Sequence, residues 1–517
     1  MADRLFTSKK SEDILERLRY STKLEYSTLA RIAFSLSLKK YGKNVPLSED
    51  SSNKREMKRT TFFGDDELLI KAILSTVYIK KFENDDELYS RTSVIKNHID
   101  SGCQLLDNIF KASNQDELKF FENLYHEIHD ERIEEEEFPL YNLQILLGKD
   151  ETTQKNLIIE LNNTEKHVNP HLAIVGKPGG GKTQFLLKIL ADIRKTSEFK
   201  TNFIFFDYKG DVSQNRDFIT ATKPLVYHLP HEHVPVNPFI LPEYTDNAIL
   251  LSSREKTESF ASIDKRFGAV QKGFLTDIIK VGYESRSSKK SKYPDFREIC
   301  AIAETFYESD KRKRDTLIEV LKDLAQFHLF WEHGDTEQPI ETLTEKSMII
   351  DLHELPVLKQ LVAYLVIERL YKEMAGLPDS KIKNGYREIR TVLVIDEAHN
   401  YLSQKNPFLE KIVREGRSKG IAVFFASQSP SDYDQPSFDF RELLEFSFIF
   451  QCDGVSAKSV QDLLACTQKT AKELQTEIAK QKVFFAISKS LVESEEVTRL
   501  KILPFYEALN KGDYSQS

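Results

Sequence analysis

Cysteines and long apolar stretches are both scarce in this chain of 517 residues. The four cysteines are Cys103, Cys300, Cys452 and Cys466, and their wide spacing excludes a zinc knuckle or a redox motif and suggests no disulfide framework. No run approaches the roughly 18 apolar residues that span a bilayer. The first ten residues, MADRLFTSKK, contain no apolar signal core. We therefore expect a soluble, cytoplasmic protein with no membrane partner.

An excess of positive charge is also missing. The chain has 73 Lys and Arg against 81 Asp and Glu, so any site for a polyanion must be local. Residues 1–111 are slightly basic, with 20 basic and 17 acidic side chains, whereas residues 112–138 hold 10 acidic and 2 basic ones. We expect a helical domain over 1–111, an acidic linker over 112–138 that its charge keeps out of any core, and an α/β domain over 139–517.

A glycine-rich segment is the strongest motif. The apolar run Leu172 to Val175 leads into GKPGGGKT and then into a helical pattern. Glycines let the backbone wrap around phosphate oxygens, where successive N–H groups and a helix N-terminus supply positive dipoles. We expect Lys182 to reach the β- and γ-phosphates of ATP and the Thr183 hydroxyl to ligate Mg²⁺. The predicted nucleotide-binding residues are Gly176, Lys177, Pro178, Gly179, Gly180, Gly181, Lys182 and Thr183.

Two adjacent carboxylates follow a second buried strand. The continuous apolar run Thr391 to Ile395 is typical of a parallel sheet, and Asp396 and Glu397 come directly after it. Because parallel strands end at one edge of a sheet, this pair is expected beside the glycine-rich loop. There Asp396 would hold Mg²⁺ and Glu397 would polarise the attacking water, although such carboxylates can also cap a helix. The pair favours hydrolysis over binding alone.

A third apolar run, Gly420 to Ala426, is followed by Ser427 and Gln428. If this strand lies between the other two, Gln428 is placed to sense the γ-phosphate; the alternative is an ordinary polar residue at a strand end. Arg414 and Arg417 precede the strand at a helix end. They complement the helix dipole in one interpretation, and in the other one of them is an arginine finger for a neighbouring subunit.

Together, GKPGGGKT, FFDYKGD, HVPVNPF, LVIDEAH and REGRSKGIAVFFASQSP resemble the HerA/FtsK group of P-loop ATPases, particularly its HerA-like branch and its conjugative coupling-protein relatives. The resemblance covers roughly residues 139 to 505. It implies an α/β, RecA-like fold with a mostly parallel central sheet and a β-rich lead-in, a homo-oligomer that is often a hexameric ring, and ATP-driven translocation of double-stranded DNA. The family pattern makes Lys182, Thr183, Asp396, Glu397 and Gln428 the ATPase set, with Arg414 or Arg417 as the finger.

The N-terminal region is predicted to be a separate, all-α domain. Its periodicity predicts helices over Ser11–Leu24 and Tyr26–Lys40. The first 110 residues or so are similar to the small DndE family of DNA phosphorothioation systems, which implies an oligomeric module that binds duplex DNA, nicked by preference. A basic cluster could grip phosphates, or could be a solvated loop. It consists of Lys39, Lys40, Lys43, Lys54, Arg55, Lys58 and Arg59.

These features predict an ATP-hydrolysing DNA motor that acts in DNA phosphorothioate modification or in linked antiphage defence, with sulfur-modification or nuclease partners. An ATP-gated DNA clamp or scaffold without translocation is the alternative. A nuclease is disfavoured, because the sequence shows no convincing carboxylate-lysine cluster and no metal-binding set of histidines.

Overall fold

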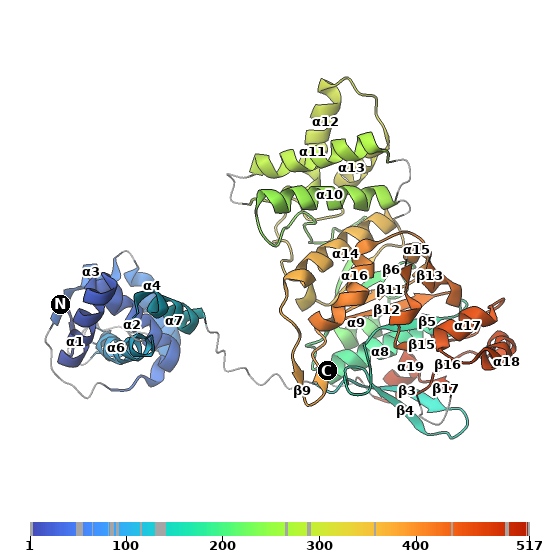
Figure 1. Cartoon of the computed structure of the whole chain (residues 1–517), viewed down its shortest axis with the longest axis horizontal. Helices are drawn as coiled ribbons and strands as arrows, with labels where there is room; N and C mark the ends of the chain where they lie inside the picture. Colours follow the sequence, from blue (N-terminus) through green and yellow to red (C-terminus); the bar gives the residue numbers. More distant parts are fainter. Residues whose placement is uncertain are drawn as a thin grey trace. The chain divides into compact units, whose positions relative to one another are not determined.

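The computed structural model describes residues 4–47, 55–64, 66–80, 82, 87–88, 93–113, 116–129, 141–263, 267–286, 291–355, 358–435, 438–491, 496–512 and 514. The chain divides into two compact units, Met1–Phe138 and Pro139–Ser517 (Figure 1). Each unit has a hydrophobic core of its own.

Helices dominate the N-terminal unit. A short antiparallel ribbon joins β1 (Arg4–Thr7) to β2 (Arg55–Lys58), an addition to the expected all-α domain. The two predicted helices are confirmed with shifted ends, as α1 (Lys9–Thr22) and α2 (Tyr26–Tyr41). The remaining elements are η1 (Gly42–Asn44), α3 (Arg59–Phe63), α4 (Glu67–Tyr78), α6 (Val94–Ala112) and α7 (Glu117–His129).

Close contact between α2 and α6 organises this unit. A Cβ atom added to Gly102 of α6 would lie 1.8 Å from the carbonyl oxygen of Ala33, so only glycine lets the two helices approach this closely. His98 of α6 is buried, and its ring hydrogen-bonds to Ser37 and Tyr78 (both 3.0 Å). Burial lowers the pKa of His98 to about 4, so the ring is a neutral packing residue.

The acidic segment differs from the expected linker in its first half. Residues 117–129 form α7, and its Phe120 and Leu124 are buried in the core of the N-terminal unit. The negative charges did not keep this stretch out of a core, because an amphipathic helix can bury its apolar side while its acidic side chains remain in water. Residues 130–138 of the predicted linker lie outside the described residues.

An 11-stranded sheet forms the centre of the second unit, in the order β4-β3-β17-β16-β15-β5-β12-β11-β6-β8-β7. Strands β15 to β7 in that order are parallel, and β4 to β16 are antiparallel. The expected β-rich lead-in is the hairpin of β3 (Gln144–Asp150) and β4 (Asn156–Glu160). The other strands are β5 (Leu172–Val175), β6 (Asn202–Asp207), β7 (Leu225–His228), β8 (Met348–Asp351), β11 (Thr391–Ile395), β12 (Ile421–Ser427), β15 (Phe446–Ile449), β16 (Phe485–Lys489) and β17 (Val497–Ile502).

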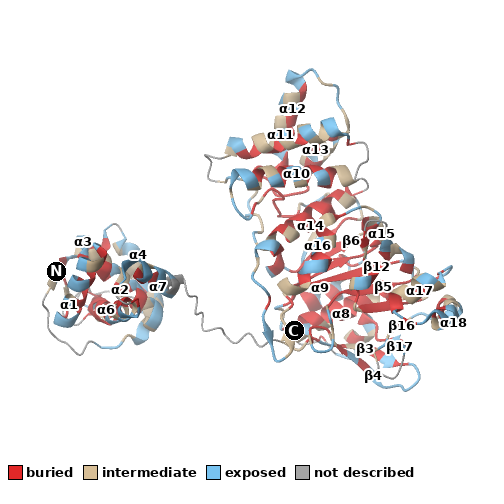
Figure 2. Cartoon of the chain, in the orientation of Figure 1, coloured by how far each residue is buried: buried red, intermediate tan, exposed pale blue. Residues whose placement is uncertain are grey.

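Successive residues of the central strands enter two different cores, one on each face of the sheet. In β11, Leu393 and Ile395 belong to the core that contains α14, whereas Val392 and Val394 belong to the core that contains α8. Both faces are therefore covered, and the central strands are buried throughout (Figure 2). This explains why their sequences are continuous apolar runs rather than alternating ones.

Helices flank the sheet, and four of them form an insertion between β7 and β8 (Figure 1). The insertion consists of α10 (Asp246–Ile263), α11 (Ala269–Arg286), α12 (Phe296–Ser309) and α13 (Thr316–Gln326). The others are α8 (Lys182–Thr196), α9 (Arg216–Thr222), α14 (Lys359–Gly376), α15 (His399–Leu402), α16 (Pro407–Glu415), α17 (Ala457–Leu464), α18 (Gln468–Lys480) and α19 (Phe505–Asn510). Within the described part of the chain, no helix combines the length and the apolar character of a membrane span.

Candidate active site

The glycine-rich loop joins β5 to the first turn of α8. Gly179 and Gly181 adopt φ angles of +79° and +109°, which glycine tolerates without strain. A Cβ atom at Gly181 would also lie 2.7 Å from the ring of Phe484. The ammonium group of Lys182 folds back over the loop and donates to the carbonyl oxygens of Gly176 and Lys177 (3.1 Å to the latter). The loop thus holds its lysine at the place where a phosphate would compete for it.

The order of the strands brings the three predicted motifs to one edge of the sheet. β12 pairs with β5 on one side and with β11 on the other, which is the arrangement that the interpretation of Gln428 as a phosphate sensor requires. Asp396 and Glu397 therefore follow β11 at the same carboxyl edge as the glycine-rich loop. Burial lowers the pKa of Lys182, while the charges of Glu397 and Asp396 oppose that shift, so these groups share one electrostatic environment.

Asp396 is a buried acid that directly follows β11. Burial, and secondarily repulsion by Glu397, raises its pKa to about 7. Its Oδ2 atom is buried and has no hydrogen-bond partner among the described residues. A buried carboxylate oxygen without a donor fits a cation ligand, so Asp396 and Thr183 in the first turn of α8 are the residues that could hold Mg²⁺.

Glu397 is held by two neighbours. It adopts a left-handed backbone conformation (φ +50°), accepts a hydrogen bond from Nε2 of Gln428 (2.8 Å) and forms an ion pair with Nζ of Lys209. Burial alone would raise the pKa of Glu397, but the bonds from Lys209 and Gln428 outweigh burial and keep it below the ordinary value. Glu397 is therefore an ionised carboxylate, with the predicted phosphate sensor Gln428 directly on it.

Lys209 is the functional residue that sequence reasoning missed. It belongs to the turn after β6, in the segment FFDYKGD, which contributes to the family resemblance but gave Lys209 no role of its own. Asp207 holds this turn, because its carboxylate accepts from the backbone N–H groups of Gly210 (2.9 Å), Val212 (3.0 Å) and Ser213 (2.7 Å). The turn also brings Asp211 close, since one carboxylate oxygen each of Asp207, Asp211 and Asp396 lie within 4.8 Å of one another. Asp211 is thus a further candidate near the cation.

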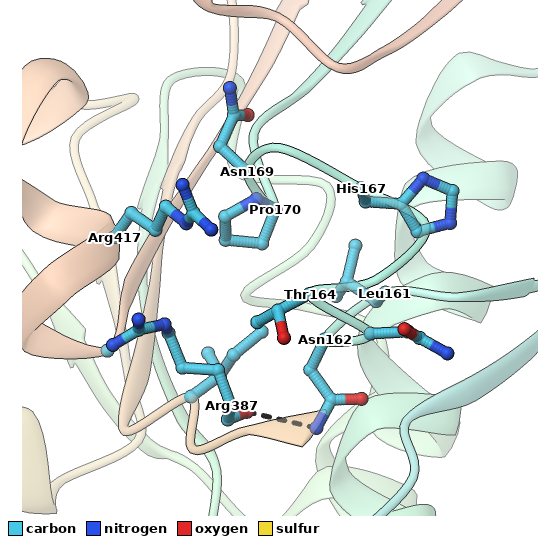
Figure 3. Close-up of a pocket in the computed structure, with 11 residues that line it drawn as sticks. Leu161, Asn162, Thr164, His167, Asn169, Pro170, Arg387 and Arg417 are labelled. Carbon is cyan, nitrogen blue, oxygen red and sulfur yellow. Dashed lines mark hydrogen bonds between the residues drawn. The ribbon is translucent and has the colours of Figure 1, made fainter. Parts of the chain in front are cut away.

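The two arginines differ in their position relative to the nucleotide site. Arg414 is exposed near the end of α16, and its guanidinium lies over the ring of Phe438 (4.6 Å). Arg417 precedes β12 and lines a small, solvent-open pocket together with Arg387, Asn162 and Asn169 (Figure 3). The seven residues of β12 separate this end from the phosphate loop by about 23 Å. Arg417 therefore cannot reach the nucleotide site of its own chain, whereas the side chain of Arg414 lies against Phe438, in the segment that follows the carboxyl end of β12.

The basic residues of the N-terminal unit fall into two groups. Lys39, Lys40 and Lys43 lie on the last turn of α2 and on η1. Arg55 and Arg59 are already engaged by Glu16 (2.8 Å) and Glu67 (2.7 Å), while the neighbouring Lys58 is exposed. Lys54 lies outside the described residues.

Two family models match the chain, one on each unit. Residues 4–114 match the family described as DNA sulphur modification protein DndE, and residues 145–374 match the central domain of helicase HerA. The family resemblance is confirmed. We call residues 1–138 the DndE-like unit and residues 139–517 the HerA-like unit.

Curated relatives and solved structures agree with these matches. The chain is 23% identical over 293 residues to the DNA import protein CedB of Sulfolobus acidocaldarius, covering 54% of this chain and 44% of CedB. It is 25% identical over 274 residues to the DNA double-strand break repair helicase HerA of the same organism, covering 51% of this chain and 52% of that protein. The chain thus spans about half the length of these relatives.

Among solved structures, VirB4 of Thermoanaerobacter pseudethanolicus matches with a TM-score of 0.53 at 16% identity, over 69% of this chain and 96% of that one. This likeness concerns the fold. Together with the sheet order, it confirms the predicted α/β, RecA-like P-loop fold.

Proposed function

We propose that this protein is an ATP-hydrolysing motor that acts on double-stranded DNA. The observation that carries the proposal is the convergence of Lys182, Asp396 and Glu397 at one edge of the sheet. Lys182 is more than 200 residues away from the two carboxylates in the sequence. The names of the relatives, a DNA import protein and a DNA repair helicase, support DNA as the substrate. A strand-displacement or roadblock assay with duplex DNA tests the proposal, and hydrolysis without directional movement would contradict it.

The residues take the following roles. Lys182 and the N–H groups of the loop hold the phosphates, Thr183 and Asp396 hold Mg²⁺, and Glu397 orients and polarises the attacking water. When bound, Mg²⁺ supplies positive charge that neutralises the phosphate oxygens. Gln428 contacts Glu397 directly, so it can report the state of the phosphate site to the residue that positions water.

One observation favours the second candidate, an ATP-gated clamp. Lys209 binds Oε1 of Glu397 and Gln428 binds Oε2, so both carboxylate oxygens attract a water molecule less strongly until these partners move away. Slow, gated hydrolysis would suit a protein whose ATP state controls assembly on DNA, without translocation. Both candidates use the same site and differ in movement along DNA.

Replacing Lys209 by methionine should raise ATP hydrolysis without DNA by about 5-fold, since it removes an ion pair of about 1 kcal/mol from the resting state of Glu397. Steady-state phosphate release measures this. Lys359→Met is the matched control, because Lys359 binds the carbonyl oxygen of Tyr208 (3.4 Å) in the same turn. An unchanged or lower basal rate in Lys209→Met would contradict the gating role.

We propose that the DndE-like unit docks the motor on duplex DNA, nicked or phosphorothioated. The setting would be DNA phosphorothioate modification or linked antiphage defence, with sulfur-modification or nuclease partners; the match of residues 4–114 to a DNA sulphur modification family supports it. We also propose that the HerA-like units assemble into a homo-oligomeric ring, a hexamer by preference, because Arg417 lies too far from its own nucleotide site to serve it.

Changing Lys39, Lys40 and Lys43 together to glutamine should weaken DNA binding and lower the slope of log affinity against log salt by roughly 0.9 for each lysine that contacts a phosphate. Fluorescence anisotropy at several salt concentrations measures both quantities. Three exposed lysines of α18 in the HerA-like unit, Lys469, Lys472 and Lys480, provide a matched control. Equal losses in both variants, or none in the first, would remove these residues from the docking role.

A further inference from the structure

A group of histidine and carboxylate side chains lies away from the nucleotide site, at the neck of the helical insertion. Ring nitrogens of His233 and His328 and a carboxylate oxygen of Asp335 all lie within 4.8 Å of one another. His233 follows β7, where the chain enters the insertion, and the other two follow α13, where it leaves. The two segments run side by side, since the N–H group of Val234 donates to Leu329 (3.0 Å) and that of Trp331 to Val236 (3.2 Å).

The separations between these atoms fit metal coordination. Nε2 of His328 and Nε2 of His233 lie 3.2 Å and 3.4 Å from the same oxygen, Oδ2 of Asp335. In a tetrahedral site with bonds of about 2.0–2.2 Å to nitrogen and oxygen, neighbouring ligand atoms are about 3.3–3.5 Å apart. The observed spacing leaves room for one ion bound by all three residues.

Hydrogen bonds alone account poorly for this arrangement. Oδ2 of Asp335 accepts from the backbone N–H of Glu332 (2.9 Å) and hydrogen-bonds to Nε2 of His328 (3.2 Å), which fills its two lone pairs; Nε2 of His233, at 3.4 Å, is left without a hydrogen bond to it. The rings of His233 and His328 also stack, with centroids 4.5 Å apart and an interplanar angle of 14°. Because the lone pair of each ring nitrogen lies in the plane of its ring, one of the two rings must turn about its χ2 torsion before both nitrogens face the same ion.

Glu332 supplies a second, independent observation. Only 2% of this residue is exposed, and its Oε1 atom is buried without a hydrogen-bond partner among the described residues. Its Oε2 atom lies 2.6 Å from Nη2 of Arg297, in an ion pair, and 3.9 Å from Nε2 of His328. Because the side chain of Arg297 is 66% exposed, Arg297 can turn towards water and leave this oxygen to an ion.

In a second group of histidine and carboxylate side chains nearby, the carboxylates already have hydrogen-bond and ion-pair partners. Asp295, Glu298 and His333 also lie within ligand distance of one another. However, Asp295 accepts from the N–H groups of Glu298 (2.8 Å) and His333 (2.7 Å), and Glu298 receives two bonds from Nε of Arg286 (2.8 and 2.7 Å). These carboxylates are occupied as caps and as an ion pair, so this second group suggests no ion.

We propose that His233, His328, Asp335 and Glu332 bind one divalent transition-metal ion, Zn²⁺ by preference, that clamps the neck of the helical insertion. Two imidazoles and two carboxylates suit zinc, and four protein ligands leave no open position, which is typical of a structural site. The ion would tie the segment that enters the insertion to the segment that leaves it. It is separate from the magnesium that the nucleotide site would hold.

The full-length protein, purified without chelator and without nucleotide, tests this proposal by elemental analysis. We expect about one zinc ion per chain in the wild type, and a loss of affinity of about 10-fold or more in His328→Ala and in Asp335→Ala. His231→Ala is the matched control, since His231 is two positions from His233 but is exposed and pairs with Glu354 (2.6 Å). Asp396→Asn should also keep the zinc, which separates this site from the nucleotide site.

Cobalt provides a readout that does not depend on the folding of any variant. Metal-stripped wild-type protein titrated with Co²⁺ should develop the strong visible absorption of tetrahedral coordination, saturate at about one equivalent and lose the signal when Zn²⁺ is added. Removing the ion should also lower the melting temperature of the wild type. Wild-type protein without zinc and without a tetrahedral cobalt spectrum would overturn the proposal. Zinc retained in both His328→Ala and Asp335→Ala would do the same.

Discussion

Replacing Lys182 by alanine should abolish ATP turnover, with a loss of at least about 1000-fold in phosphate release. Lys182 is the lysine of the phosphate loop, only 7% exposed, and its ammonium group lies against the carbonyl oxygens of that loop. Alanine would leave the negative charge that develops on the transferred phosphate without this partner. Lys195→Ala, at the far end of the same helix, is the matched control and should keep most of the activity.

Glu397→Gln should behave differently from Lys182→Ala, which separates binding from chemistry. Glutamine keeps the size of the side chain but cannot carry the negative charge that polarises water. We therefore expect ATP to bind with near-normal affinity while turnover stops, so that an ATP-bound state accumulates. Equilibrium binding of a fluorescent ATP analogue, measured beside phosphate release, tests this pair. Normal turnover in either variant would contradict the assigned roles.

The grouping of the candidate nucleotide-site residues could be predicted from the sequence because these residues lie in short segments at strand ends. Continuous apolar runs such as Leu172–Val175 and Thr391–Ile395 identify buried parallel strands, and such strands deliver the residues after them to one edge. The position of β12 between β5 and β11 was only a condition of the argument for Gln428, and the structure supplies it.

Contacts made by packing could not be predicted in this way. Lys209 reaches Glu397 only because β6 and β11 pair in parallel, which joins positions 188 residues apart in the sequence. The histidine group escaped detection for the same reason, since His233 and His328 meet only across the neck of the insertion. Net charge predicted that the segment containing α7 stays out of any core. This was wrong, because Phe120 and Leu124 pack the helix into the core of the N-terminal unit.

The position of the two arginines leads to the last prediction, which concerns subunits acting together. Arg417→Ala should lower turnover by about 1000-fold or more, the range in which arginine fingers act, although it leaves the phosphate loop and both carboxylates of its own chain intact. Arg414→Ala, tested in parallel, decides between the two candidates. Arg414 packs on Phe438 whereas Arg417 lines a pocket with Arg387, so the structure favours Arg417.

Mixing two inactive variants tests whether Arg417 acts on a neighbouring subunit. An Arg417→Ala subunit has an intact Glu397, and a Glu397→Gln subunit has an intact Arg417, so a mixed oligomer contains interfaces where both groups are intact. At equal concentrations and random assembly, about one interface in four has this composition, and turnover should recover to roughly that fraction of the wild-type value. If Arg417 served its own chain, no site would contain both groups, and the mixture would remain as inactive as its components.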